Sequence, residues 1–259
     1  MPSASPAAKP SRQPVNRSSI SKNTGKVGWH ETNNRLLTNH QIVIADEESV
    51  EPVRPHLKAW NRDYSSRGRL WAGGVKDLPN LPESSVVLEM GCGNGKTFSA
   101  MLGQPWCIVA LDVSMAAVRL CHTHSANRGA FLAADASCLP FQNKSFDAVF
   151  AFHILGHVLF DDREMMAMEA SRVLKGGGML FFRDFEREDM RCGMGDEVEP
   201  KTYRRGQGVV THYFTEAEAK SLFHQLKPIS ISIARWKMRI RDQEKNRSEV
   251  EAVFQKAVI

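Results

Sequence analysis

The chain has 259 residues, of which 42% are hydrophobic and 24% are charged, and its formal net charge is +5. This length and hydrophobic content suffice for one large α/β domain with a buried core. Its five cysteines form no CxxC pair, which argues against a disulfide framework or a zinc knuckle and indicates a reduced, intracellular protein. No apolar run approaches the roughly 18 residues of a membrane-spanning helix, so we expect a soluble, cytoplasmic protein without a membrane partner.

Positive charge gathers at the two ends of the chain. Residues 1–26 carry five Lys or Arg and no acidic residue. Residues 27–200 carry 17 basic and 23 acidic residues, and residues 201–259 carry 12 basic and 6 acidic residues. This asymmetry favours a polyanionic partner such as nucleic acid, although solvated surface accounts for many such runs. Residues 1–28 hold few large apolar side chains, so we expect a disordered basic tail. An organellar transit peptide is the alternative, but the tail lacks an amphipathic apolar face.

Residues 29–85 form an N-terminal extension, helical or irregular, ahead of a main domain over residues 86–259. In that domain short apolar runs alternate with helical stretches, which is typical of βαβ units in a parallel sheet. The expected strands are Val86–Met90, Ile108–Val113, Ala130–Ala134, Phe146–Phe152 and Met179–Phe185. The expected helices are Lys96–Leu102, Ser114–His124 and Asp161–Leu174, the last ended by three glycines at 176–178.

Residues 186–211 show little periodicity and are predicted to be a long substrate loop, because structureless connections of this length tend to be functional. The sequence TEAE at Thr215 to Glu218 is a capping box, which predicts a helix as far as about Leu226. The stretches PISISIARW and VEAVFQKAVI follow it, and the first of them has the pattern of a strand.

A glycine-rich loop follows the first strand of the domain, in VVLEMGCGNGK from Val86 to Lys96. Glycines after a buried strand allow a sharp turn and let backbone amides approach an anionic or nucleotide-like ligand. The spacing G-x-G-x-G matches neither the dinucleotide fingerprint nor the P-loop, so a plain strand-to-helix turn is an alternative. Cys92 inside the loop reads as small filler.

Two aspartates end the next two strands. Asp112 is suitably positioned for ribose hydroxyls, and Asp135 beside Ala136 offers a carboxylate and an amide to an adenine edge. Either aspartate alone could merely cap a helix or turn. Open α/β sheets bind ligands at the carboxyl ends of their strands, so the three features together predict a bound adenosine.

With these elements the sequence resembles the class I S-adenosylmethionine-dependent methyltransferases. The resemblance rests on LEMGCGNGK, ALDVS, DASCLPFQNKSFDAVFAFHILGH and RVLKGGGMLFF. It implies a Rossmann-like, mostly parallel sheet with an antiparallel last strand and helices on both faces, and S-adenosylmethionine as cofactor. In that family's pattern, Gly91, Gly93 and Gly95 would hold the methionine part, Asp112 the ribose, and Asp135 and Ala136 the adenine. Phe152 would line the pocket, and Glu89 would orient the loop or the cofactor's amino group.

A narrower resemblance is to the 3-methylcytidine tRNA methyltransferases. It rests on LFFRDFEREDM, YRRGQGVVTHYFTEAEAKSLF, VEAVFQKA and the W-x-x-x-Y pair Trp60 and Tyr64. It implies methylation of cytidine N3 in a tRNA anticodon loop, with both aromatics against the cofactor. Without the family, Trp60 and Tyr64 are an ordinary i,i+4 packing pair. The family's Asp-Gly-Thr-Arg is Gln-Gly-Val-Val here, at 207–210, which leaves the base, its position and the tRNA open.

A carboxylate near the cytosine ring would stabilise the cationic product of N3 methylation. Asp184 is the first candidate for this role and Asp189 the second, with salt bridges to nearby arginines as the alternative. Because N3 lies on the pairing edge, the base must be single-stranded or flipped out. Arg183, Arg204 and Arg205 are the predicted substrate contacts.

Other readings stay open from the sequence. A small-molecule methyltransferase acting on quinones or other metabolites would share the cofactor motifs, with His157 as a base. A non-catalytic subunit that binds S-adenosylmethionine would account for the altered 207–210 segment, and an accessory protein partner is also left open. His153 and His157 stand four apart, but no carboxylate or cysteine completes a ligand set, so no metal is expected.

Overall fold

The computed structural model describes residues 42–44, 55–68, 75, 78–126, 128–206 and 208–258. The tail predicted over residues 1–28 and parts of the extension over residues 29–85 lie outside these ranges. Among the described helices, none is both long and apolar enough to cross a membrane.

A central sheet organises the fold, and within the described residues it has eight strands in the order β1-β4-β3-β2-β5-β6-β11-β10. All neighbours are parallel from β1 to β6, whereas β11 is antiparallel to both β6 and β10. The Rossmann-like prediction is therefore confirmed, including the antiparallel last strand. The strands are β1 (Ile42–Ile44), β2 (Val86–Met90), β3 (Cys107–Asp112), β4 (Ala130–Ala133), β5 (Phe146–Phe152), β6 (Leu174–Phe185), β10 (Lys227–Ile240) and β11 (Gln243–Gln255).

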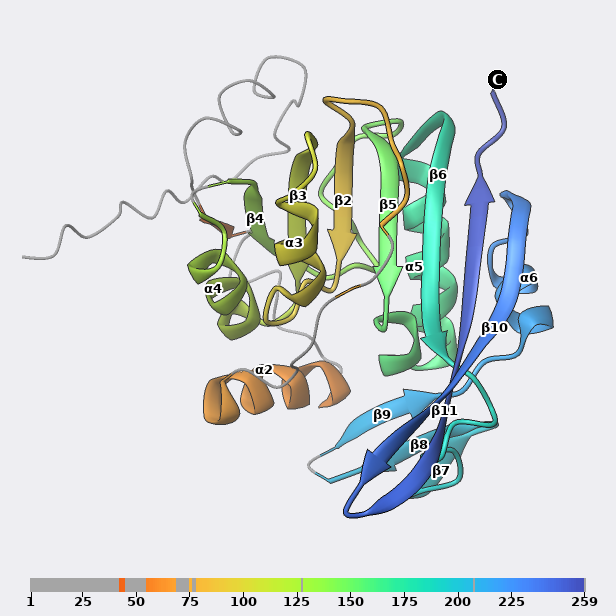
Figure 1. The fold of residues 1–259 in the computed structure, drawn as a ribbon. Helices are drawn as coiled ribbons and strands as arrows, with labels where there is room; N and C mark the ends of the chain where they lie inside the picture. The colour runs from red at the N-terminus through yellow and green to blue at the C-terminus, as the bar shows by residue number, and fades with distance from the viewer. Residues whose placement is uncertain are drawn as a thin grey trace, which may run out of the picture.

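Helices cover both faces of the sheet (Figure 1). Successive strand residues point to opposite faces, so Val87 packs in a cluster with Phe98 and Val118 while Leu88 packs in another with Met166 and Phe223. The first cluster lies under α3 (Lys96–Met101) and α4 (Met115–Thr123), and the second under α5 (Phe160–Val173) and α6 (Glu216–Leu222). Both faces of the sheet are buried, which explains why the central strands consist of nearly continuous runs of apolar residues.

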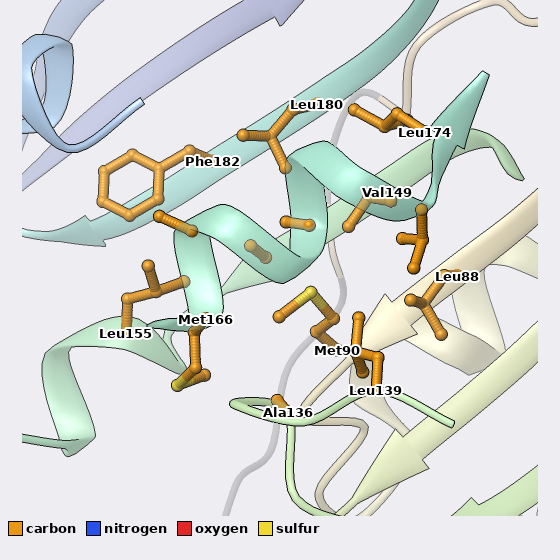
Figure 2. Packing of buried hydrophobic residues seen from close by; sticks show 14 of the residues in the cluster. Leu88, Met90, Ala136, Leu139, Val149, Leu155, Met166, Leu174, Leu180 and Phe182 are labelled. Atoms are coloured by element: carbon orange, nitrogen blue, oxygen red, sulfur yellow. The ribbon is translucent and has the colours of Figure 1, made fainter. Parts of the chain in front are cut away.

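The larger of the two clusters is closely packed (Figure 2). It joins Leu88 and Met90 of β2 to Val149 of β5, to Leu180 and Phe182 of β6, and to the inner side of α5. The Phe182 ring meets the rings of Phe214 and Phe223 edge to face, at centroid distances of 5.2 and 5.3 Å. This cluster fixes β6 against α6.

The long loop expected over residues 186–211 is wrong in its second half. Residues from Asp196 onward form a separate antiparallel sheet of β7 (Asp196–Glu199), β8 (Thr202–Arg205) and β9 (Val209–His212). Its strands are only four residues long, too short for a period-two pattern to stand out, and their backbone pairing is invisible in local sequence. The three glycines at 176–178 also lie inside β6, directly after α5 ends, rather than in a loop.

The β10–β11 hairpin extends past the end of β6, the strand that joins it to the sheet. Strand β11 pairs with β6 only from Glu249, opposite Phe185, to Gln255, opposite Met179. From Gln243 to Ser248 its ladder partner is β10 alone. Because Phe185 is the carboxyl end of β6, the hairpin projects beyond the carboxyl edge of the parallel strands, beside β7–β9 (Figure 1).

Truncation of Phe182 to alanine should lower the free energy of unfolding by about 3–5 kcal/mol, because it removes a buried ring that the surrounding rings cannot replace. Met168→Ala, on the exposed side of α5, is the matched control and should change stability by about 0.5 kcal/mol or less. Urea unfolding followed by circular dichroism measures both. Equal effects of the two substitutions would contradict this account of the core.

Candidate functional site

A pocket of about 530 Å³ lies at the carboxyl ends of the parallel strands. It is lined by the loops after β2, β3, β4 and β5, by α2 (Pro55–Arg67) and by the β10–β11 hairpin. Figure 1 shows α2 beneath the ends of these strands. Every residue that the sequence assigned to the cofactor lines this pocket except Gly95: Trp60, Tyr64, Glu89, Gly91, Gly93, Asp112, Asp135, Ala136 and Phe152.

The glycine loop needs its glycines for two different reasons. Gly93 has a φ of +52°, and a Cβ there would lie 2.6 Å from the Tyr64 hydroxyl, so the loop and α2 approach more closely than a side chain allows. Gly95 has a φ of +81° and is the N-cap residue that precedes α3, and a Cβ there would lie 3.1 Å from Cys121 Sγ. Gly95 thus shapes the turn from outside the pocket.

Asp112 ties the glycine loop to the end of β3. Its Oδ2 accepts a hydrogen bond from the Gly93 N–H at 2.9 Å, and its Oδ1 accepts one from the Ser114 N–H at 2.8 Å. Burial raises the pKa of Asp112 to about 6, against the opposing effect of these hydrogen bonds. A carboxylate has about four acceptor positions, so Asp112 keeps capacity for hydroxyl donors on its pocket side.

Glu89, at the carboxyl end region of β2, is a buried carboxyl group on the pocket wall. Its Oε2 has no hydrogen-bond partner among the described residues. Burial, and next the charge of Asp112, raise the pKa of Glu89 to about 8. An unsatisfied buried carboxyl oxygen is costly, so this atom fits a ligand that brings an ammonium or another N–H donor.

Helix α2 presents two aromatic side chains to the pocket. Trp60 and Tyr64 lie one turn apart with ring centroids 6.0 Å from each other, and Trp60 also meets the His157 ring at 4.7 Å. Asn61 Oδ1, on the same helix, accepts a hydrogen bond from the Ser114 hydroxyl at 2.9 Å. The helix is therefore fixed to α4, and its aromatic pair faces the pocket as well as packing.

His153 and His157 also line the pocket. His153 has a φ of +53°, a strained conformation for a residue with a side chain, and its N–H donates to the Arg183 carbonyl at 2.7 Å. Burial lowers the pKa of His157 to about 4, so its neutral ring donates from Nδ1 to the Val210 carbonyl at 2.9 Å. In the part of the chain that the structure describes, no three His, Cys, Asp or Glu side chains are arranged to hold a metal ion.

The two candidate catalytic aspartates lie away from the pocket lining. Asp184 is fully buried, and its oxygens accept hydrogen bonds from the N–H groups of Gly156 at 2.7 Å and Phe185 at 2.9 Å. Asp189 forms ion pairs with Arg247 at 2.5 Å and Arg191 at 3.2 Å. Neither carboxylate lines the pocket and both are buried against groups of the chain itself, so the geometry favours a supporting role for them and their catalytic role stays a prediction.

The predicted substrate arginines are dispersed rather than gathered. Arg183 pairs with Glu251 at 2.9 Å and lies over the Phe152 ring, outside the pocket lining. Arg204 is exposed on β8, and Arg205 donates to the Thr211 hydroxyl at 3.3 Å. The structure brings none of these three arginines into the pocket.

The hairpin supplies pocket residues that sequence reasoning missed. Trp236, Met238 and Ile240 alternate along β10 and line the pocket, as do Arg247 and Glu249 of β11. The intervening cations, Arg235, Lys237 and Arg239, pair with Glu188, Glu244 and Asp242. Alternation in RWKMRI was the available signal, but only the register of the hairpin shows which face meets the site.

Glu89→Gln should flatten the dependence of stability on pH. Because the pKa of Glu89 is raised from 4.5 to about 8, the folded chain keeps a proton that the unfolded chain releases, so wild-type stability falls as the pH rises between these values. The glutamine variant loses this contribution, on the order of a few kcal/mol across the window. Chemical unfolding at pH 5 and pH 8.5 measures it.

Glu83→Gln, at an exposed position before β2, is the control and should keep the wild-type profile. Asp112 and Asp184 have pKa values raised in the same direction, so some pH dependence should persist in both variants. A Glu89→Gln profile that overlays the wild type would contradict the burial of an ionisable Glu89.

The chain is similar to methyltransferases over its central part. The family model described as "Methyltransferase domain" matches residues 88–182. The tRNA N(3)-cytidine methyltransferase METTL2 of Gallus gallus is 32% identical over 162 residues, which are 57% of this chain and 44% of that protein. The tRNA (carboxymethyluridine(34)-5-O)-methyltransferase of Arabidopsis thaliana is 31% identical over 132 residues, 50% of this chain and 30% of that protein.

Solved structures share the sheet. A SAM-dependent methyltransferase from Methanosarcina mazei superimposes with a TM-score of 0.57 at 22% identity, covering 69% of this chain and 95% of that one. By contrast, this chain spans less than half the length of its Gallus gallus relative. The matched segment runs from Leu88 in β2 to Phe182 in β6 and carries most of the pocket. Residues 88–182 are thus similar to a methyltransferase domain, and the chain shares its Rossmann-like fold with a SAM-dependent methyltransferase of known structure, as the resemblance in its sequence indicated.

Proposed function

We propose that this chain is an S-adenosylmethionine-dependent methyltransferase and that its acceptor is the N3 atom of a cytidine in a tRNA anticodon loop. The observation that carries the proposal is the convergence, in one pocket, of the glycine loop, Asp112, and Asp135 with Ala136. These features come from the ends of successive parallel strands, where this class of sheet binds nucleotides.

The residues present fit S-adenosylmethionine. Glu89 offers an unsatisfied carboxyl oxygen to the amino group, and Asp112 offers its remaining acceptor positions to the ribose hydroxyls. Asp135 and Ala136 provide an acceptor and an amide for the adenine edge, while Phe152 and Tyr64 supply apolar wall. When bound, the sulfonium supplies a methyl group to a nucleophile by in-line displacement, for which the protein chiefly provides position.

A nucleic-acid acceptor is supported by the part of the pocket beyond these residues. It is lined by Phe185 and Trp236 together with Arg191 and Arg247, and aromatic and arginine side chains are the groups that take up unstacked bases. The relatives named above act on tRNA according to their names. We further propose that the extension over residues 29–85 closes the cofactor end through α2, and that the described β7–β9 sheet, with Arg204 and Arg205, approaches the RNA backbone.

The proposed reaction needs no general base. The N3 lone pair of cytosine attacks the methyl carbon directly, and the product ring carries a positive charge. The neutral His157 ring donates its Nδ1–H to the Val210 carbonyl, and its pKa is lowered. We therefore assign it the role of positioning Trp60 rather than of accepting a proton. Asp184 and Asp189 act indirectly, by fixing the backbone at Gly156 and the two pocket arginines.

Incubation of the purified chain with tritium-labelled S-adenosylmethionine and total small RNA, followed by nucleoside mass spectrometry, tests the proposal. We expect 3-methylcytidine. Gly93→Ala should weaken binding of S-adenosylhomocysteine and reduce labelling by about fivefold or more, since strain and a close contact of this kind cost at least about 1 kcal/mol. Gly103→Ala, where a Cβ meets nothing closer than 3.6 Å, is the matched control and should retain activity.

Labelling of a different nucleoside, such as a modified uridine, would overturn the cytidine assignment and keep the tRNA substrate. Labelling of metabolite extracts but not of RNA would overturn the tRNA proposal in favour of a small-molecule acceptor. Cofactor binding with no turnover on either would favour a non-catalytic subunit or the need for an accessory protein.

A further inference from the structure

The hairpin side of the pocket has an apolar wall that is only partly covered by the rest of the described chain. Trp236 and Met238 line the pocket from β10, yet they remain 37% and 38% exposed. Phe185, at the end of β6, continues the wall, and the Arg247 guanidinium lies over both the Phe185 and Trp236 rings, at 5.2 and 5.4 Å. Large apolar side chains exposed inside a concave site indicate a ligand with a flat apolar face.

A single carboxylate, Glu249, lines this half of the pocket from among the described residues. The residue is only 8% exposed, and it lies on β11 opposite Phe185. Among the described residues, the basic side chains within 4 Å of it are His153, through Nε2 at 3.4 Å, and Arg183, through Nε at 3.9 Å. Both contacts are longer than a charge-assisted hydrogen bond of about 2.7–2.9 Å, so Glu249 retains strong acceptor capacity.

Among the described residues, no cation makes a short ion pair with Glu249. Arg183 makes its short ion pair with Glu251, at 2.9 Å, and Arg247 makes its own with Asp189. Burial lowers the pKa of His153 well below its usual value, so the ring beside Glu249 is neutral. Burial likewise raises the pKa of Glu249, which is the direction expected for a carboxylate that lacks a full set of donors.

We propose that this half of the pocket is a base-binding subsite, in which a cytosine ring lies against Trp236 and donates its exocyclic amine to the Glu249 carboxylate. The inference rests on the proposed function for the identity of the acceptor and adds the residue that selects it. Uracil presents a carbonyl oxygen where cytosine has the amine, so the same carboxylate repels it. Glu249 takes the role that the sequence assigned to Asp184.

The subsite also fits the charge change of the reaction. The N3 lone pair forms the new N–C bond, the S–C bond breaks with its electron pair going to sulfur, and the positive charge moves from sulfur to the cytosine ring. No proton is transferred. The exocyclic amine shares the new charge, so its hydrogen bond to Glu249 strengthens as the bond forms, which is the form of electrostatic stabilisation that accelerates a reaction.

Binding can be tested without turnover. The probe is a fluorescent anticodon stem-loop RNA with one loop cytidine, compared with the same RNA carrying pyrimidin-2-one there, a base that keeps N3 and lacks the amine. Anisotropy is measured at fixed salt with saturating S-adenosylhomocysteine. We expect the wild type to prefer cytidine by about tenfold or more, because the amine donates a hydrogen bond to a charged acceptor.

Glu249→Gln should abolish most of this preference while leaving the affinity for S-adenosylhomocysteine unchanged, which reports that the variant is folded. Glu251→Gln is the matched control, since it lies two residues along the same strand, also contacts Arg183, and does not line the pocket. It should keep the wild-type preference. An equal effect of the two substitutions, or no cytidine preference in the wild type, would overturn the subsite.

The methylation assay separates this inference from the proposed function. Formation of 3-methylcytidine together with an unchanged preference in Glu249→Gln would overturn the subsite alone. Loss of preference in Glu249→Gln without any RNA methylation would support the subsite and overturn the proposed activity.

Discussion

Parallel pairing of β2 with its neighbours is the constraint on which the rest of the structure depends. It aligns the carboxyl ends of β2, β3, β4 and β5 at one edge, so loops distant in sequence meet there. The hydrogen bond from the Gly93 N–H to Asp112 then joins the loops after β2 and β3. Together with the hydrogen bonds from the N–H groups of Gly91 and Cys92 to the Leu111 carbonyl, it holds the glycine loop at the strand ends, where open α/β sheets bind nucleotides.

Three carboxyl groups near this edge of the sheet are buried at a cost in free energy. Glu89, Asp112 and Asp184 are all buried, and burial raises the pKa of each. Buried carboxyl groups are retained at the expense of stability. Asp184 recovers part of this cost through two backbone hydrogen bonds, whereas Glu89 has an oxygen without a donor among the described residues. This contrast distinguishes Asp184, whose oxygens accept bonds from backbone N–H groups, from Glu89, whose Oε2 accepts none among the described residues.

The hairpin adds a second source of pocket residues that the parallel strands do not provide. Strand β11 is antiparallel to β6 and begins before their pairing starts at Glu249. Its first part, which pairs with β10 alone, extends past the carboxyl edge of the parallel strands and, with the β10 residues opposite, brings Arg247 and Trp236 to the site. Asp189 holds Arg247 in place from the region after β6. Most residues that line the pocket at the ends of the parallel strands belong to the matched segment, residues 88–182, whereas those of α2 and of the hairpin lie outside it.

The sequence by itself determined the strand and helix alternation, the parallel sheet, and the strand-end residues that line the pocket, because each depends on local patterns: apolar runs, a glycine loop and strand-terminal aspartates. Tertiary structure alone decided the β7–β9 sheet, the burial of Asp184 and Asp189, and the entry of Glu249 into the pocket. These features depend on antiparallel register and on which face of a strand meets the site. A shift of one residue in register would turn Glu249 to the opposite face, and no local property of the sequence specifies that register.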